Sequence, residues 1–178
     1  PVASGGGYAA QASSANAVSD STVKSYVEGA VTNIEGQLLT DVFATSYAKA
    51  EVLKPTVDVN LASAAVVLID SEAKGTYKAY IDTTGSEKDN GVSAGSIKVA
   101  VGYQTNADAI TGPGGGTGVS INGASIEVNR AVAKTTTNAE SYVSGNGKLT
   151  VEKENLDILV RGKAVSTAKI TPDTISVS

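Results

Sequence analysis

The chain has 178 residues, with 14 basic and 18 acidic side chains and a formal net charge of −4. It lacks His, Cys, Met and Trp, which excludes a Ser-His-Asp triad, a cysteine nucleophile, a disulfide and imidazole or thiolate metal sites. The acidic balance argues against a nucleic-acid partner, which requires a concentrated basic face. No apolar run reaches the ~20 residues of a membrane helix, so we expect no membrane insertion by this segment.

Four prolines divide the chain at nearly even intervals, at positions 1, 55, 113 and 172. Each interval contains a similar tyrosine segment: Ser25–Gly29, Ala79–Thr83 and Ser141–Gly145. Even spacing of equivalent segments is typical of repeat proteins. We therefore predict a single array of three repeats of about 54–59 residues, at 1–54, 55–112 and 113–171, followed by the first strand of a fourth repeat at 172–178.

Apolar and polar side chains alternate within these repeats, as they do in strands with one buried face. The alternating pairs and triplets, in chain order, are Val57/Val59, Ile97/Val99/Val101, Val119/Ile121, Ile126/Val128, Leu149/Val151 and Leu156/Ile158/Val160. Turn residues such as Asp89-Asn90-Gly91 and Gly145-Asn146-Gly147 separate the runs. We predict an all-β solenoid with more than one coil per repeat, each coil of roughly 18–25 residues, forming a rod about 35–50 Å long.

Residues 22–53 give a mixed signal. Val31, Ile34 and Leu38 recur at helical spacing, with few helix-breaking residues before Pro55. The repeat alignment instead places Leu38–Val42 beside Ser96–Ala100 and beside the strand that begins at Leu156. We expect a strand here, because equivalent repeats share a fold, and a helical insertion stays open as the alternative.

Several segments resemble the passenger repeats of large Gram-negative surface adhesins, the autotransporter and filamentous-haemagglutinin-like proteins. They are Lys78–Asp82, Gly95–Ala100 and Gly118–Asn122, set in a chain rich in Ala, Val, Ser, Thr and Asn. The resemblance extends over all three repeats and is largely one of composition. It implies a right-handed parallel β-helix that is displayed outside the cell.

Three segments resemble known functional motifs. Gly91–Gly95 matches the G-x-S-x-G nucleophile elbow, but that motif needs a histidine base and a following helix, so we expect a turn before a strand. The polar loop 82–91 offers oxygen ligands for Ca²⁺ without ordered spacing and with Lys88 in its middle, so we expect a solvated loop. Gly114–Gly118 completes no phosphate-binding motif and is expected to be a connector. We therefore assign no catalytic, cofactor-binding or metal-binding residues.

Two further patterns suggest recognition surfaces. Tyr26, Tyr80 and Tyr142 could form an exposed aromatic stripe, but their strict repetition favours structural positions that stack from coil to coil. Thr135–Thr137 raises an ice-binding hypothesis, which would require a threonine ladder on every coil, and no such ladder recurs.

The predicted function is therefore non-enzymatic: a structural or adhesive segment of an extracellular surface protein, a rigid rod or stalk. Its expected partners are neighbouring repeats of a longer chain or identical subunits, with loops at 82–91 and 113–118 presented to an unidentified host or cell-surface receptor. The alternative is a protomer of an extracellular filament that stacks head-to-tail, since the two ends of the chain match in repeat phase. A third hypothesis, a carbohydrate-active β-helix, would require clustered acids in a cleft, such as Asp82, Glu87 and Asp89.

Overall fold

The computed structural model describes residues 8–53, 62–84, 91–112 and 124–171, and the regular structure in these ranges is β-strand. The strands are β1 (Tyr8–Glu28), β2 (Val31–Leu53), β3 (Ala62–Asp82), β4 (Val92–Gly112), β5 (Ala124–Ser144), β6 (Leu149–Val151) and β7 (Leu156–Lys169). The described part of the chain contains no helix long and apolar enough to span a membrane.

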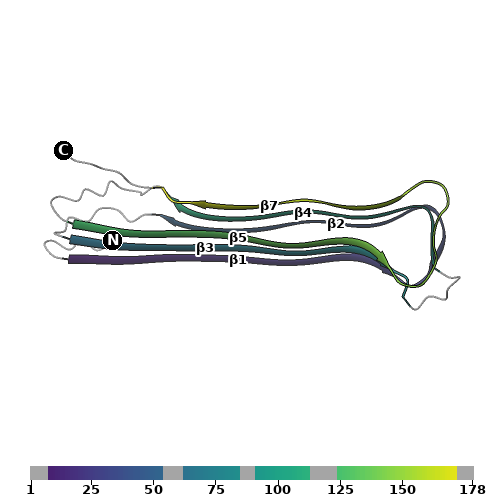
Figure 1. Cartoon of the computed structure of the whole chain (residues 1–178), viewed down its shortest axis with the longest axis horizontal. Helices are drawn as coiled ribbons and strands as arrows, with labels where there is room; N and C mark the ends of the chain where they lie inside the picture. The colour runs from purple at the N-terminus through teal and green to yellow at the C-terminus, as the bar shows by residue number, and fades with distance from the viewer. Residues whose placement is uncertain (1–7, 54–61, 85–90, 113–123, 172–178) are drawn as a thin grey trace.

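The strands form two sheets in which every pairing is parallel. The first sheet has the order β1-β3-β5, and the second has β2-β4-β6, with β7 also paired to β4. The chain runs out along the first sheet and returns along the second, so the two layers face each other with opposite strand directions (Figure 1). An all-β fold with parallel sheets is thereby confirmed.

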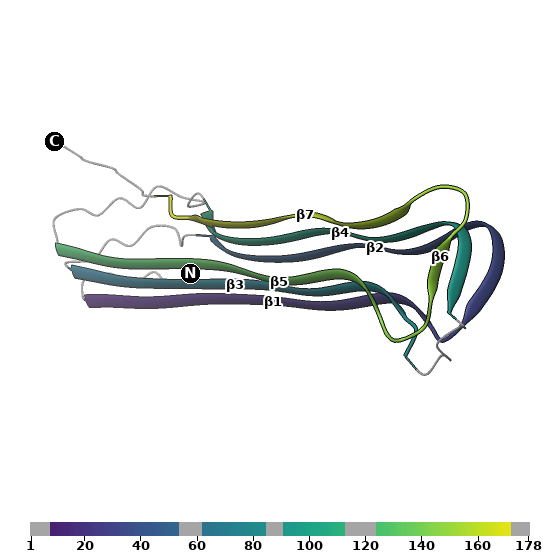
Figure 2. The ribbon, with the colours of Figure 1, turned by 45° about the vertical axis from the view of Figure 1, so that its right-hand side comes forward.

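The coil length predicted from the sequence is wrong. Each predicted repeat contributes one long strand to the first sheet and one to the second, or β6 plus β7 in the last repeat. The long strands have 21 to 23 residues, which corresponds to about 70 Å at the rise of a strand. The layers are extended rather than curled (Figure 2). Among the described residues, the first sheet has three strands and the second has four, with β6 and β7 both paired to β4.

The ambiguous residues 22–53 form the end of β1 and all of β2, so the strand prediction is confirmed and the helical alternative is wrong. The predicted alignment is shifted by one residue, because Leu38 pairs with Ile97 rather than with Ser96. Ile97 pairs in turn with Leu156, where the sequence predicted the equivalent strand. Irregular register between Val31 and Gln37 marks the bend at which β2 enters its layer.

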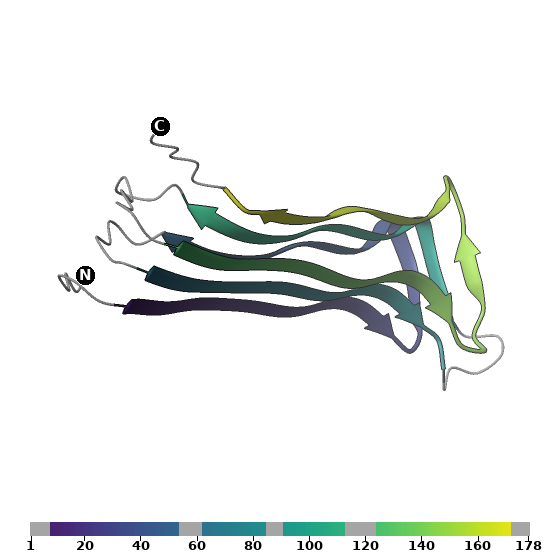
Figure 3. The same cartoon turned by 60° about the vertical axis from the view of Figure 1, so that its left-hand side comes forward.

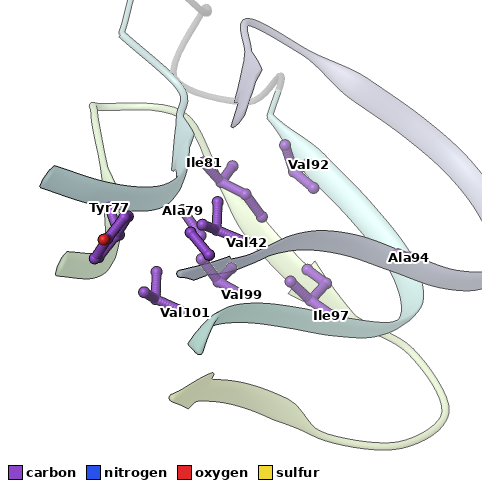
Figure 4. Close-up of a cluster of buried hydrophobic side chains, with 10 residues drawn as sticks. Val42, Tyr77, Ala79, Ile81, Val92, Ala94, Ile97, Val99 and Val101 are labelled. Carbon is purple, nitrogen blue, oxygen red and sulfur yellow. The ribbon is translucent and has the colours of Figure 1, made fainter. Parts of the chain in front are cut away.

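The core lies between the layers, and its largest side chains gather near the bend (Figure 4). This cluster comprises Val42, Ala44, Tyr77, Ala79, Ile81, Val92, Ala94, Ile97, Val99 and Val101. The alternation predicted for Ile97, Val99 and Val101 is confirmed, because all three are buried. Burying these apolar side chains is the main favourable contribution to folding at this end of the molecule.

In the middle of the strands the core narrows to the small side chains Ala48, Ala73 and Ala107, and larger residues such as Val67 and Ile69 are buried again beyond them. Serine hydroxyls bridge the layers there: Ser46 Oγ donates to the Lys74 carbonyl at 3.0 Å, and Ser71 Oγ donates to the Ala48 carbonyl at 2.9 Å. Such bonds satisfy hydroxyls that would otherwise be buried without a partner. Alanine and serine thus allow the two sheets to pack close together, which explains why the chain is rich in small residues.

Glycine is required at the turn that leaves the first sheet. Gly29 follows β1 and Gly145 follows β5, and both have a positive φ, of 87° and 101°. Only glycine adopts this conformation without a steric penalty. The tyrosine segments of the first and third predicted repeats therefore end in glycine because the turn requires a positive φ. In the second, Thr83 holds the turn through its hydroxyl, which accepts a hydrogen bond from Gly147 N at 3.0 Å.

Several predicted features lie outside the described residues. These are the four prolines, the strands predicted at 56–60, 118–122 and 173–178, and the glycine connector 114–118. Most of the polar loop 82–91 also falls outside, including Glu87 and Asp89.

Candidate functional site

The outer face of the first sheet carries a tyrosine ladder, formed by Tyr26, Tyr80 and Tyr142. Tyr26 pairs in register with Tyr80, and Tyr80 pairs with Tyr142. Both adjacent ring pairs have centroids 5.1 Å apart, with interplanar angles of 7° and 3°. The neighbours Ala79 and Ile81 are fully buried, so the Tyr80 side chain points away from the core. The predicted stacking of these positions is confirmed.

The ladder geometry limits what these rings can recognise. Sugar-binding aromatic platforms work through an open ring face, but both faces of Tyr80 are covered by its neighbours. Its hydroxyl donates to Glu28 Oε1 at 3.2 Å, which ties β3 to β1. The ladder is suited to holding three strands in one register.

Ion pairs between β3 and β5 flank the ladder. Lys78 Nζ lies 2.8 Å from Glu140 Oε2, and Lys134 Nζ lies 3.1 Å from Glu72 Oε1. Arg130 contacts Asp70 at 3.4 Å in the same sheet. Each exposed pair adds little to stability by itself. Together the ion pairs favour one strand register, because a slip of one residue would move every one of these side chains to the opposite face.

These contacts change the pKa values of the side chains involved. Hydrogen bonds from Lys134 and Lys74 lower the pKa of Glu72, and bonds from Lys78 and Asn138 lower that of Glu140. The Glu140 carboxylate in turn raises the pKa of Lys78. Partial burial, followed by the hydrogen bond to Glu28, raises the pKa of Tyr80. The charged forms of the carboxylates and of Lys78 are therefore favoured in the folded state.

We expect stability to fall in acid. Because folding lowers the pKa of Glu72 and Glu140 from their ordinary value of 4.5, their contribution is complete above that pH and is lost as pH falls through the folded-state pKa. Urea unfolding midpoints should be level between pH 6 and 9, as rough bounds, and drop near pH 3. A double Glu72→Gln, Glu140→Gln variant should show a smaller acid decline. An equal decline in both proteins would contradict this origin.

The nucleophile-elbow pattern Gly91–Gly95 forms the beginning of β4 instead of the predicted turn, because the strand already starts at Val92. Ser93 Oγ donates to Glu152 Oε1 at 2.7 Å, on an extended backbone rather than at a strand-to-helix turn. Gly95 lies against the backbone of Glu35, where a Cβ atom would stand 2.5 Å from the carbonyl oxygen. The glycines of this motif serve close backbone packing.

The described part of the polar loop forms a local turn. Asp82 Oδ1 accepts hydrogen bonds from Thr84 Oγ1 at 2.6 Å and from Thr84 N at 2.8 Å, and these bonds lower the pKa of Asp82. Within the described residues, no three Asp, Glu, His or Cys side chains gather in a group that could hold a metal ion. The Asp82 carboxylate is engaged in holding the turn after β3.

The threonine run Thr135–Thr137 does not form a ladder. Thr136 is exposed, whereas its two neighbours face inward, and Thr135 Oγ1 contacts Ser166 Oγ at 3.1 Å. Thr135 pairs with Ala73, which pairs with Ser19, so no threonine continues this row. The geometry required by the ice-binding hypothesis is absent from these three strands.

Sequence reasoning missed the contacts that cross between layers or depend on exact register. Tyr77 stacks on Tyr103 of the opposite layer, with ring centroids 5.8 Å apart. The hydroxyl of Tyr47 donates to Asp108 Oδ2 at 3.0 Å across β2 and β4. For the first sheet, the spacing between the tyrosine segments could have predicted the strand register. No comparable marker exists for the contact between the layers.

The described fold and surface define an all-β protein of two facing parallel sheets, the first of which carries an aromatic ladder and ion pairs on its outer face. Comparison with known proteins gave no match to a family model, to a curated protein or to a solved structure.

Proposed function

We propose that the chain is a non-enzymatic structural segment of an extracellular surface protein, a rigid β-solenoid rod or stalk of adhesin type. One observation supports this above all: residues of the three predicted repeats pair in parallel register along both sheets, without interruption in the first sheet and from Leu38, Ile97 and Leu156 onward in the second. In a stacked array each unit holds its neighbours in this way, and stability grows with each added unit. The tyrosine ladder and its flanking ion pairs fit this mechanical role.

In this proposal each repeat of about 54–59 residues is one flattened coil. Parallel strands of one sheet that are joined by a crossover are right-handed in nearly all proteins, which favours the right-handed β-helix implied by the adhesin resemblance. The loops between strands, including 82–91 and 113–118, are the surfaces offered to a receptor. The stacked strands act as the scaffold that presents them.

The extracellular assignment rests on the resemblance to surface adhesins and has a direct test. An antibody raised against the folded chain should label intact cells that produce the protein, and permeabilisation should add little signal. A cytoplasmic marker examined in parallel controls for broken cells. Labelling that appears only after permeabilisation would overturn the extracellular role, whatever the shape of the chain.

A further inference from the structure

We propose that the two ends of the strand stack bind each other, so that a second copy of this chain extends both sheets. The proposal rests on the structural role above and names its partner. Among the described strands, β1 and β2 are outermost at one end of the stack, and β5 and β7 are outermost at the other (Figure 3). Long outer strands present backbone groups that readily pair with another chain.

The register of the junction follows from the register inside the chain. In the first sheet the row Tyr26, Tyr80, Tyr142 continues if Tyr26 of the second copy stacks on Tyr142. In the second sheet the row Leu38, Ile97, Leu156 continues in the same way. This arrangement pairs β5 with β1 of the second copy, and β7 with its β2.

Charge is complementary across the junction in this register. Lys24 faces the like charge of Lys78 inside the chain, and it would face Glu140 of the neighbouring copy. In the second sheet, Lys169 would face Glu51 of the second copy, because both pair with Ile110 from opposite sides. Among the positions paired in β1, β3 and β5 and in the stretch of β2, β4 and β7 from Leu38, Ile97 and Leu156 onward, no two like charges stand directly opposite each other at this junction.

Aromatic and apolar groups at the two ends are complementary as well. Phe43, which is 82% exposed, would face the Arg161 guanidinium of the adjacent copy, a favourable cation–π pairing. Ile158 and Val160 are 44% and 47% exposed, although their in-register partners Val99 and Val101 are buried.

The cause of this exposure is a missing facing strand. β4 lies across both β3 and β5, whereas β7 lies across β5 alone among the described strands. In the proposed junction, β1 of the second copy fills the open place. Its inward Val23, now 37% exposed, would lie over Ile158 and Val160. The apolar surfaces left open at the two ends therefore cover each other.

Cysteine cross-linking tests this register, because the native chain has no cysteine. Asp20 and Thr136 pair with Lys74 from opposite sides, so Thr136 should face Asp20 of the second copy. Paired positions on adjacent strands lie about 4.8 Å apart, within the range of a disulfide. An Asp20→Cys chain mixed with a Thr136→Cys chain should form a disulfide-linked dimer on oxidation.

The matched control moves one cysteine by two residues. In a mixture of Asp20→Cys and Asn138→Cys chains, the Cα atoms of the two cysteines would lie about 8 Å apart, too far for a disulfide. Strong cross-linking of the first mixture and weak cross-linking of the second supports the proposal. Equal yields, or a chain that sediments only as a monomer at every concentration tested, would overturn it.

Charge reversal gives a second, independent test. Lys169→Glu and Glu51→Lys should each raise the concentration needed for assembly about fivefold, since each sets like charges face to face at the junction. An equimolar mixture of the two variants should restore assembly, because Glu at 169 of one then meets Lys at 51 of the other. Circular dichroism should show both variants folded. No recovery in the mixture would contradict the register.

The two proposals fail separately. A chain that labels intact cells but stays monomeric would contradict the stacking alone. A chain that stacks in this register but is found only inside cells would contradict the extracellular role alone.

Discussion

Replacing Tyr77 with alanine is expected to lower the free energy of unfolding by about 3–5 kcal/mol, the cost of removing a large aromatic side chain from a core. Tyr77 is fully buried, stacks on Tyr103 and belongs to the cluster beside the bend. The narrow space between two sheets cannot collapse around the vacancy without disturbing many paired strands. Urea unfolding followed by circular dichroism measures the loss.

Tyr77→Phe is the matched control, and it should be as stable as the native chain or slightly more stable. The Tyr77 hydroxyl is buried and has no hydrogen-bond partner among the described residues. An unsatisfied buried hydroxyl costs about 1–3 kcal/mol, and phenylalanine removes it while keeping the ring. A phenylalanine variant as unstable as the alanine variant would show that the hydroxyl has a partner, contrary to the structure.

Gly91→Ala is expected to destabilise the chain by about 3 kcal/mol, at the upper end of the range for overpacking, because the clash is with backbone. A Cβ atom at this position would collide with the Lys148 carbonyl oxygen. That oxygen accepts a hydrogen bond from Val92 N, and the Gly91 carbonyl accepts one from Val31 N. Gly91 therefore lies in a hydrogen-bonded row that joins all three predicted repeats.

Gly36→Ala is the control for this prediction. Gly36 also lies in the bend region and is exposed, and a Cβ atom there would meet nothing within 4 Å. Its replacement should change the melting temperature little, or raise it slightly, since alanine loses less backbone entropy on folding. Equal destabilisation by both substitutions would show that the close approach at Gly91 does not exist.

The sequence predicted best where inward positions hold large β-branched residues. In β4, Ile97, Val99 and Val101 alternate with smaller or polar neighbours, and the strand was evident. The tyrosine ladder was predicted because each interval between prolines contains a tyrosine in an equivalent segment, so the positions could be matched between repeats.

The prediction failed where the core consists of small residues. The inward positions of β1 include the small residues Ala15, Ala17 and Ser19, whereas the larger apolar Val18 faces outward and is 60% exposed, so hydropathy does not mark the buried face. The sequence of such a 21-residue strand resembles a series of short strands and loops. The predicted coil was therefore too short. Alanine and serine serve here to bring the layers close together, a requirement that becomes apparent only when both layers are known.

The ion pairs could not be predicted for a different reason. Lys78 and Glu140 meet only if the register of β3 and β5 is correct to the residue. The alignment of Leu38 with Ser96 was wrong by one residue, and such an error exchanges the two faces of a strand. Composition and repeat period are enough to predict the class of fold. Predicting which side chains pair also requires the exact register of the strands.

The most direct test of the two-sheet arrangement is a distance between Thr22 and Asn138, from the first and third predicted repeats. Both side chains are exposed, and both residues pair with Thr76 from opposite sides. With one long coil per repeat, their Cα atoms lie two strand spacings apart, about 10 Å. Spin labels on a Thr22→Cys, Asn138→Cys variant should therefore show strong dipolar broadening. Coils of about 20 residues would separate the same positions by about 25 Å or more, and a distance of that size would contradict the account.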